Sequence, residues 1–172
     1  IPYNSDYSSY DFAFYEEEDN EGWVYYTNTT TQTDRDYFPD ALTPGQGYLT
    51  GTTSTVPFTG SLNNGDVSCP VDSTGERDGW NAVGNPYTSA INIVSFITYN
   101  TSTNDILAAE YGSVYVWNED DAYTGSEQYY KAIGRDGYEG YGMSDDLLDS
   151  TLVQAGQGFL INAGDNGNVV FT

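Results

Sequence analysis

The sequence contains no histidine, one cysteine and only four basic residues, and each scarcity excludes a class of protein. Without histidine there is no Ser-His-Asp or Cys-His arrangement, no His-rich zinc site and no imidazole base near neutral pH. The four basic residues stand against 26 acidic ones, and the net charge of −22 repels nucleic acids and anionic membranes. The single Cys69 cannot form an internal disulfide, and its alternation with Val67 and Val71 predicts a small buried side chain.

Long hydrophobic runs are also scarce, and no segment is typical of a transmembrane span or a signal peptide. The chain begins at Ile1-Pro2 without a methionine, which predicts a processed chain or a fragment. The 17 Tyr, 7 Phe and 3 Trp residues indicate a folded protein, because disordered chains are poor in aromatic residues. Tyr, Thr, Val and Ile favour strands, and 19 Gly residues supply turns. No stretch has sustained helical spacing, so the prediction is mostly β.

Two passages of the sequence occur twice, in the same order. The hairpin-like segment 10–28 matches 112–133, since both have an alternating strand, an acidic turn and a Tyr-Tyr strand. The segments 44–60 and 155–172, which both contain Gly-Gln-Gly, form the second matching pair. The offset between matched residues drifts steadily upward along the chain, as loop insertions in a duplicated unit would produce. We therefore predict two related copies.

The stretch from 58 to 93 has only one clear copy. Asn64-Gly65 predicts a hairpin turn, and Trp80 begins a strand that ends before a turn at Pro86. The nearly continuous apolar run over 91–100 predicts a fully buried strand. In the second Gly-Gln-Gly segment Phe159 and Ile161 are expected to point together into the core, and the glycines to mark a bulge or a close backbone approach.

These patterns predict an all-β fold, a duplicated antiparallel β-sandwich-like module of two related sub-units. Residues 1–57 form the first, incomplete copy of the module, and residues 58–172 form the second, fuller copy. The motifs FTGSLNNGDVSCPV, GWNAVGNPYTSAI, VYVWN, AGQGFLINA and VVFT, in this order, resemble a β-rich module of large secreted and cell-surface Bacteroidetes proteins. In those proteins the module often precedes a type IX secretion sorting domain. The resemblance implies an exported, extracellular protein, secreted or at the cell surface, and a β fold, but no reaction.

Acidic residues crowd two matching turns and raise the question of a metal. Calcium takes several oxygen ligands in flexible geometry, so these carboxylates are calcium candidates, although a solvated acidic hairpin tip is the commoner case. No other cofactor is expected. The candidates are Glu16, Glu17, Glu18, Asp19 and Glu21 in the first turn, and Glu119, Asp120 and Asp121 in the second.

The sequence contains two kinds of candidate glycan site, aromatic side chains for stacking and acceptor residues for covalent attachment. Trp23 and Trp117 flank the acidic turns and could stack on sugar rings. Two Asp-Ser-Thr tripeptides match the O-glycosylation pattern that the family resemblance implies, with Ser73 and Ser150 as acceptors. Asn28 and Asn100 fit the N-linked acceptor pattern in a host with that machinery.

An enzyme is not expected, because 26 acidic residues supply so many carboxylate pairs that no pair stands out. The leading hypothesis is a non-enzymatic extracellular structural protein, a filament or adhesive-matrix subunit whose copies join head-to-tail by β-strand complementation. The alternative is a carbohydrate-binding module of a larger secreted protein.

Each copy lacks a strand that the other has, so one chain's terminus would complete the next chain's sheet. A fragment of a longer tandem array explains the same pattern. The residues expected at the junction are Ile1, Pro2, Tyr3, Val169, Val170 and Phe171.

Overall fold

The computed structural model describes residues 12–17, 22–25, 42–50, 59–109, 112–117, 130–134 and 151–172. Within these ranges lie eleven strands and one helix. They are β1 (Phe12–Tyr15), β2 (Trp23–Tyr25), β3 (Tyr48–Thr50), β4 (Val67–Val71), β5 (Trp80–Gly84), β6 (Ile91–Asn92), α1 (Ile93–Ser102), β7 (Ser113–Trp117), β8 (Tyr130–Gly134), β9 (Leu152–Val153), β10 (Gly158–Asn162) and β11 (Gly167–Phe171).

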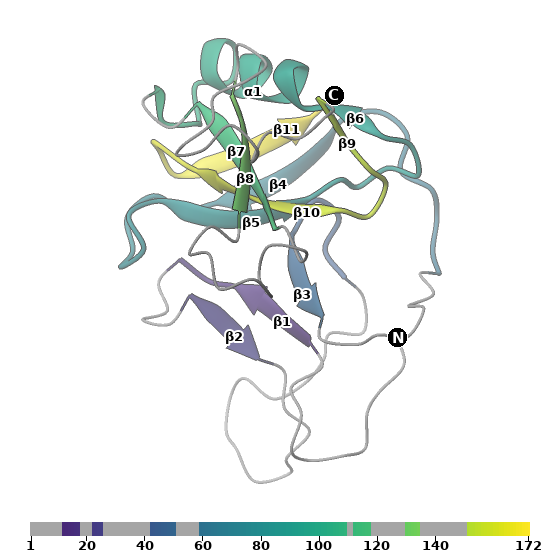
Figure 1. Ribbon diagram of the computed structural model, residues 1–172, viewed down its shortest axis with the longest axis horizontal. Helices are drawn as coiled ribbons and strands as arrows, with labels where there is room; N and C mark the ends of the chain where they lie inside the picture. The colour runs from purple at the N-terminus through teal and green to yellow at the C-terminus, as the bar shows by residue number, and fades with distance from the viewer. Residues whose placement is uncertain are drawn as a thin grey trace, which may run out of the picture.

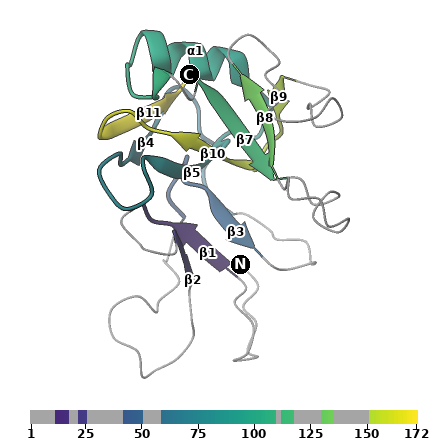
Figure 2. The same cartoon turned by 60° about the vertical axis from the view of Figure 1, so that its left-hand side comes forward.

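The strands form four antiparallel sheets, ordered β2-β1-β3, β5-β10-β7-β8, β11-β4 and β6-β9. Figure 1 shows α1 and β11 at one end of the molecule, the four-stranded sheet in the middle and the β2-β1-β3 sheet at the other end. The turned view in Figure 2 keeps this order of layers. The prediction of an all-β fold is confirmed.

The repeat in the sequence has a counterpart in the order of the strands. The three-stranded sheet β2-β1-β3 corresponds, strand for strand, to β8-β7-β10 in the four-stranded sheet. The fourth strand, β5, pairs with β10 from Gly84 to Trp80 and also forms an isolated bridge between Val83 and Gln46. Residues of both matched segments therefore contact β5. The boundary that we predicted after residue 57 lies outside the described residues.

Both Gly-Gln-Gly segments form the same turn. Gly45 and Gly156 have φ of 85° and 72°, and each following Gln donates its backbone N–H to the carbonyl three residues earlier, both at 3.2 Å. Glycine fits here because a Cβ disfavours positive φ. A close approach of this kind is present in the first segment, at Gly47, where an added Cβ would lie 2.8 Å from backbone atoms of Ala82 and Val83, but not at the equivalent Gly158, where the nearest atom would be the Val83 oxygen at 3.5 Å.

The core lies between α1, the β11-β4 pair and the four-stranded sheet. Phe96 of α1 packs against Phe171 and Phe159, with ring centroids 4.8 Å and 5.6 Å away. Cys69, Phe159 and Ile161 are buried, as their alternation predicted.

The strand predicted over 91–100 is wrong, because most of this run forms α1. Asn92 caps the helix by accepting a hydrogen bond from the Ser95 backbone N–H at 3.0 Å. The buried positions are Ile93, Phe96, Ile97 and Asn100, which is helical spacing. Asn100, the last of these four buried residues, is polar, so the apolar residues alone did not reveal the helical periodicity. Among the described residues no helix has the length and apolar character to cross a membrane.

The predicted hairpin at Asn64-Gly65 is also wrong. Gly65 has the expected positive φ, 87°, but residues 59–66 contain no strand. The segment instead leads directly into β4, whose partner is β11 rather than a neighbour in sequence. The turn therefore does not join two hydrogen-bonded strands, and it forms part of a surface groove.

Candidate functional site

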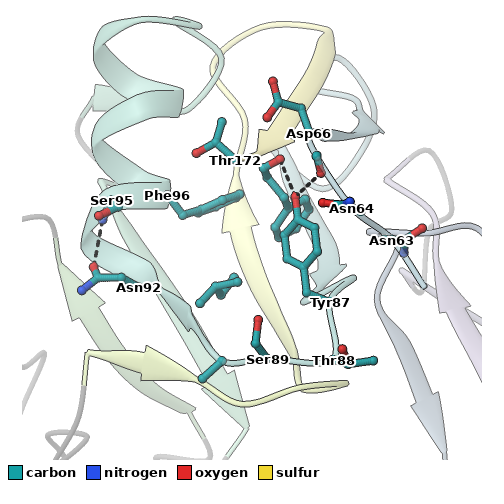
Figure 3. Close-up of a pocket in the computed structure, with 14 residues that line it drawn as sticks. Asn63, Asn64, Asp66, Tyr87, Thr88, Ser89, Asn92, Ser95, Phe96 and Thr172 are labelled. Carbon is teal, nitrogen blue, oxygen red and sulfur yellow. Dashed lines mark hydrogen bonds between the residues drawn. The ribbon is translucent and has the colours of Figure 1, made fainter.

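A groove of about 520 Å³ opens beside the end of β11. It lies between the 63–66 turn, the 87–92 segment, the first turn of α1 and the residues that end the chain's last strand. In Figure 3 the Tyr87 ring stands on one side, Asn92 and Ser95 stand on the opposite side, and Ser89 points into the space between them. Segments distant in sequence therefore form this groove.

Side-chain amides hold the groove's walls in place. Asn85 is buried, its amide nitrogen donates to the carbonyls of Ser89 and Val153 at 2.8 Å and 3.2 Å, and its side-chain oxygen accepts from the Tyr87 N–H at 2.9 Å. The Asn63 amide donates to the Pro86 carbonyl at 2.7 Å, which ties the 63–66 turn to the opposite segment. The buried Asn85 amide and the exposed Asn63 amide together fix the loop conformation before any ligand arrives.

Tyr87 connects three parts of the groove. Its hydroxyl lies 2.8 Å from the Phe171 carbonyl oxygen and 2.9 Å from the Gly65 carbonyl oxygen (Figure 3), so it can donate to either. Burial raises the pKa of Tyr87, and the negative charge of Asp66 raises the pKa further. The Asp66 carboxylate is therefore within electrostatic reach of the groove's aromatic wall.

Among the described residues, the lining is polar and uncharged except at one residue. Amides, hydroxyls and backbone groups lie around the partly exposed Tyr87 ring and above the buried Phe96 and Phe171, and Asp66 is the one acidic residue of this described lining. No lysine or arginine is among the lining residues that the structure describes. The polar side chains are Asn63, Asn64, Thr88, Ser89, Asn92, Ser95 and Thr172. Such a surface can offer many neutral hydrogen bonds beside the aromatic face of Tyr87.

A family model described as a domain of unknown function (DUF8693) matches residues 2–172. The chain belongs to this family. No curated protein and no solved structure matches it. The matched range includes the β2-β1-β3 sheet and every residue of the groove, so the groove is part of the DUF8693 domain itself.

Of the two tryptophans predicted to stack on glycans, Trp23 is not among the described residues that line this groove. Trp23 is half-buried and meets the Tyr15 ring edge-on at 5.2 Å, far along the chain from the groove's segments. Trp117 lies in β7, but its side chain is outside the described residues. Tyr87 was missed, because the sequence Asn-Pro-Tyr was interpreted only as a turn. The available signal was an aromatic residue directly after a turn proline, because binding residues are often found on loops.

The acidic turn delivers one carboxylate into the protein. Glu17 is buried, and its Oε1 accepts from the Gly79 N–H at 2.8 Å, while its Oε2 has no hydrogen-bond partner and contacts Gly75. Glu16 is half-buried. No three acidic or cysteine side chains are grouped in the part of the chain that the structure describes. Six of the calcium candidates lie outside that part: Glu18, Asp19, Glu21, Glu119, Asp120 and Asp121. The calcium site stays a prediction.

The O-glycosylation candidate Ser73 lies in a loop after β4. Its hydroxyl and its N–H both donate to the Asn166 side-chain oxygen, at 3.0 Å and 2.6 Å. The neighbouring Thr74 donates to the Asp72 carboxylate through its backbone N–H at 2.8 Å and through its hydroxyl at 2.9 Å, and these bonds, the backbone one foremost, lower the pKa of Asp72. Modification of Ser73 would therefore replace a hydrogen bond, and the prediction stays a prediction. Ser150 lies outside the described residues.

The N-glycosylation prediction at Asn100 is wrong. Asn100 is fully buried in α1, and its amide nitrogen donates to the Phe96 and Val170 carbonyls at 3.0 Å and 2.9 Å. A glycan on that nitrogen would have no room and would remove both bonds. The other candidate, Asn28, lies outside the described residues.

The prediction that the last strand offers an open edge is also wrong. Along Val169, Val170 and Phe171, one edge of β11 pairs with β4 of the same chain. On the other edge the Asn100 side chain accepts from the Val170 N–H and donates to the Val170 carbonyl, both at 2.9 Å. A side-chain amide thus takes the place of a neighbouring strand. Ile1, Pro2 and Tyr3 lie outside the described residues, so assembly through them stays a prediction.

Cys69 is expected to resist thiol reagents in the native protein. Burial raises the pKa of its thiol from 9.0 to about 11, so the thiolate population at neutral pH falls about 100-fold on this ground alone. Ellman's reagent should therefore react at least about 100-fold more slowly with native protein than with protein in 6 M guanidinium. Similar rates in the two conditions would contradict this prediction.

Proposed function

We propose that this DUF8693 protein is a non-catalytic glycan-binding module whose binding site is the groove beside Tyr87. The observation that carries the proposal is the lining: neutral amide and hydroxyl groups surround the partly exposed Tyr87 ring in a groove whose walls are held by internal hydrogen bonds. The proposal agrees with the expectation of an exported protein, since extracellular polysaccharides would then be its ligands.

Sugar chemistry matches this lining. A pyranose ring presents an apolar face, which packs on aromatic rings, and hydroxyl edges, which exchange hydrogen bonds with amides and hydroxyls. Tyr87 offers a partly exposed ring on one wall, and Asn92 and Ser95 offer polar groups on the other (Figure 3). The volume of about 520 Å³ lies within the usual range for ligand sites, roughly 300–1,000 Å³.

A steric block of the groove tests the proposal. Ser89 is exposed and points into the groove, so Ser89→Trp should fill it without breaking a side-chain contact of the fold. In affinity electrophoresis through gels containing β-glucan, xylan, mannan or soluble chitin derivatives, we expect at least one glycan to retard the wild type. Ser89→Trp should lose that retardation.

The matched control is Ser102→Trp, which places the same side chain on the exposed last residue of α1. This variant should migrate like the wild type in every gel. The proposal fails if no glycan retards the wild type, or if Ser89→Trp is retarded as strongly as Ser102→Trp. Circular dichroism of both variants confirms that each is folded.

A further inference from the structure

Charge is unevenly distributed along the groove. Asp66 and Thr172 lie at one end, next to the Tyr87 hydroxyl, while Asn92 and Ser95 lie across from them at the start of α1 (Figure 3). Of the lining side chains in the described ranges, Asp66 alone carries a full charge. The groove therefore has a negative end and an end formed by a capped helix N-terminus.

On the basis of the proposed function, we infer that the groove selects sugars by charge. It binds amino sugars, whose ammonium group sits at the Asp66 end, in preference to their uncharged N-acetylated counterparts, and it rejects uronic acids. The ligand class is thus a polysaccharide that contains deacetylated amino sugar.

Three observations support this selection. An ammonium group in the groove would meet the Asp66 carboxylate with no competing lysine or arginine among the described lining residues, and charge-assisted hydrogen bonds are the strong ones. The Asp66 charge contributes to raising the pKa of Tyr87, so it acts on the groove's aromatic wall. The chain as a whole, at a net charge of −22, attracts cations and repels anions over longer distances.

The start of α1 is the competing effect. A helix N-terminus carries about half a positive elementary charge and favours anions. Here the Asn92 side chain already accepts from the Ser95 N–H, which satisfies one of the free donors at that end. A full carboxylate charge together with the net charge of the chain outweighs this partial charge, so the sign of the selection is set by Asp66.

The test compares three oligosaccharides of equal length by calorimetry at low salt and about pH 5.5, where amino groups are protonated. They are glucosamine, N-acetylglucosamine and galacturonic acid hexamers. We expect the glucosamine hexamer to bind about fivefold tighter than the acetylated one, as one partly exposed charge-assisted contact would give. The galacturonic acid hexamer should show no heat of binding.

Two variants distinguish selection by Asp66 in the groove from a general attraction to the acidic protein surface. Asp66→Asn should bring the Kd of the glucosamine hexamer to within about twofold of the Kd that the same variant has for the acetylated hexamer. Asp165→Asn removes an equal charge from an exposed turn after β10 and should keep the fivefold preference. Ser89→Trp should abolish binding of both hexamers.

The contrary results distinguish a failure of the charge selection from a failure of the proposed function. If Asp66→Asn keeps the preference, or if the galacturonic acid hexamer binds as well as the others, the charge selection is wrong while the proposed function stands. If glucosamine hexamer binds equally to Ser89→Trp, its binding is a general attraction to the acidic surface, and the selection in the groove is wrong. If no hexamer and no polysaccharide binds the wild type, the proposed function itself fails.

Discussion

Alanine at Gly47 should destabilise the protein by about 2–3 kcal/mol, the upper part of the range of about 1–3 kcal/mol that overpacking typically costs, because the neighbouring atoms have little freedom to move. The added Cβ would lie 2.8 Å from the Ala82 carbonyl carbon and from the Val83 nitrogen and oxygen. All three are backbone atoms of β5, which also pairs with β10, so they have little freedom to move. The smaller entropy of the unfolded alanine chain offsets only about 0.4–1 kcal/mol. Urea denaturation followed by tryptophan fluorescence measures the loss.

The duplicated segment supplies a matched control for this change. Gly158 is the equivalent glycine of the second copy, and a Cβ there would meet the Val83 oxygen at 3.5 Å, an ordinary contact. Gly158→Ala should therefore change the free energy of unfolding by less than about 1 kcal/mol, with a gain allowed by the unfolded-chain entropy. Equal losses at the two glycines would show that the close approach of Gly47 to β5 is not the cause.

Replacing Asn100 by alanine should cost about 2–5 kcal/mol, because two partly buried backbone groups of Val170 lose their partners and each such loss costs about 1–3 kcal/mol. The Asn100 side chain makes four hydrogen bonds, of which two complete the β11 edge. Amide exchange of the Val170 N–H, followed by NMR, should accelerate along with the loss of stability.

Two further variants identify the donor and acceptor roles. Asn100→Asp keeps the shape and can still accept from the Val170 N–H, but it cannot donate to the Val170 carbonyl, so it should be at least as unstable as Asn100→Ala. Asn104→Ala removes a contact with the Asn168 carbonyl at the exposed end of the same edge and should cost less than about 1 kcal/mol. If Asn104→Ala costs as much as Asn100→Ala, the edge is held differently.

Where the sequence predicted correctly, the signal was local or repeated. Side chains alternate across any strand, so Cys69, Phe159 and Ile161 could be assigned to the core without knowledge of their partners. The repeat predicted that two sets of strands would be related, and β2-β1-β3 and β8-β7-β10 have the same order. The glycine in each turn follows from positive φ, which is a property of single residues.

The wrong predictions concern partners rather than single residues. A short apolar run fits a buried strand or a buried helix equally well, and what distinguishes 93–102 is a cap at Asn92 and a polar Asn100 in the apolar face. The role of Asn100 depends on Val170, 70 residues away, whose backbone it pairs with as a strand would. Counting the strands of each copy could not reveal that a side chain closes the edge.

The amino-acid sequence by itself determined the all-β class, the duplication and the inward-facing residues of its strands, because these depend on local alternation and on internal comparison. Only the tertiary structure decided that β11 is closed within its own chain and that Tyr87, Asp66 and Ser89 lie around one groove. The groove brings together the 63–66 turn, the 87–92 segment, α1 and the end of β11, and such contacts between distant segments arise only when the chain has packed. A site made of single, widely spaced polar residues leaves no pattern in the sequence.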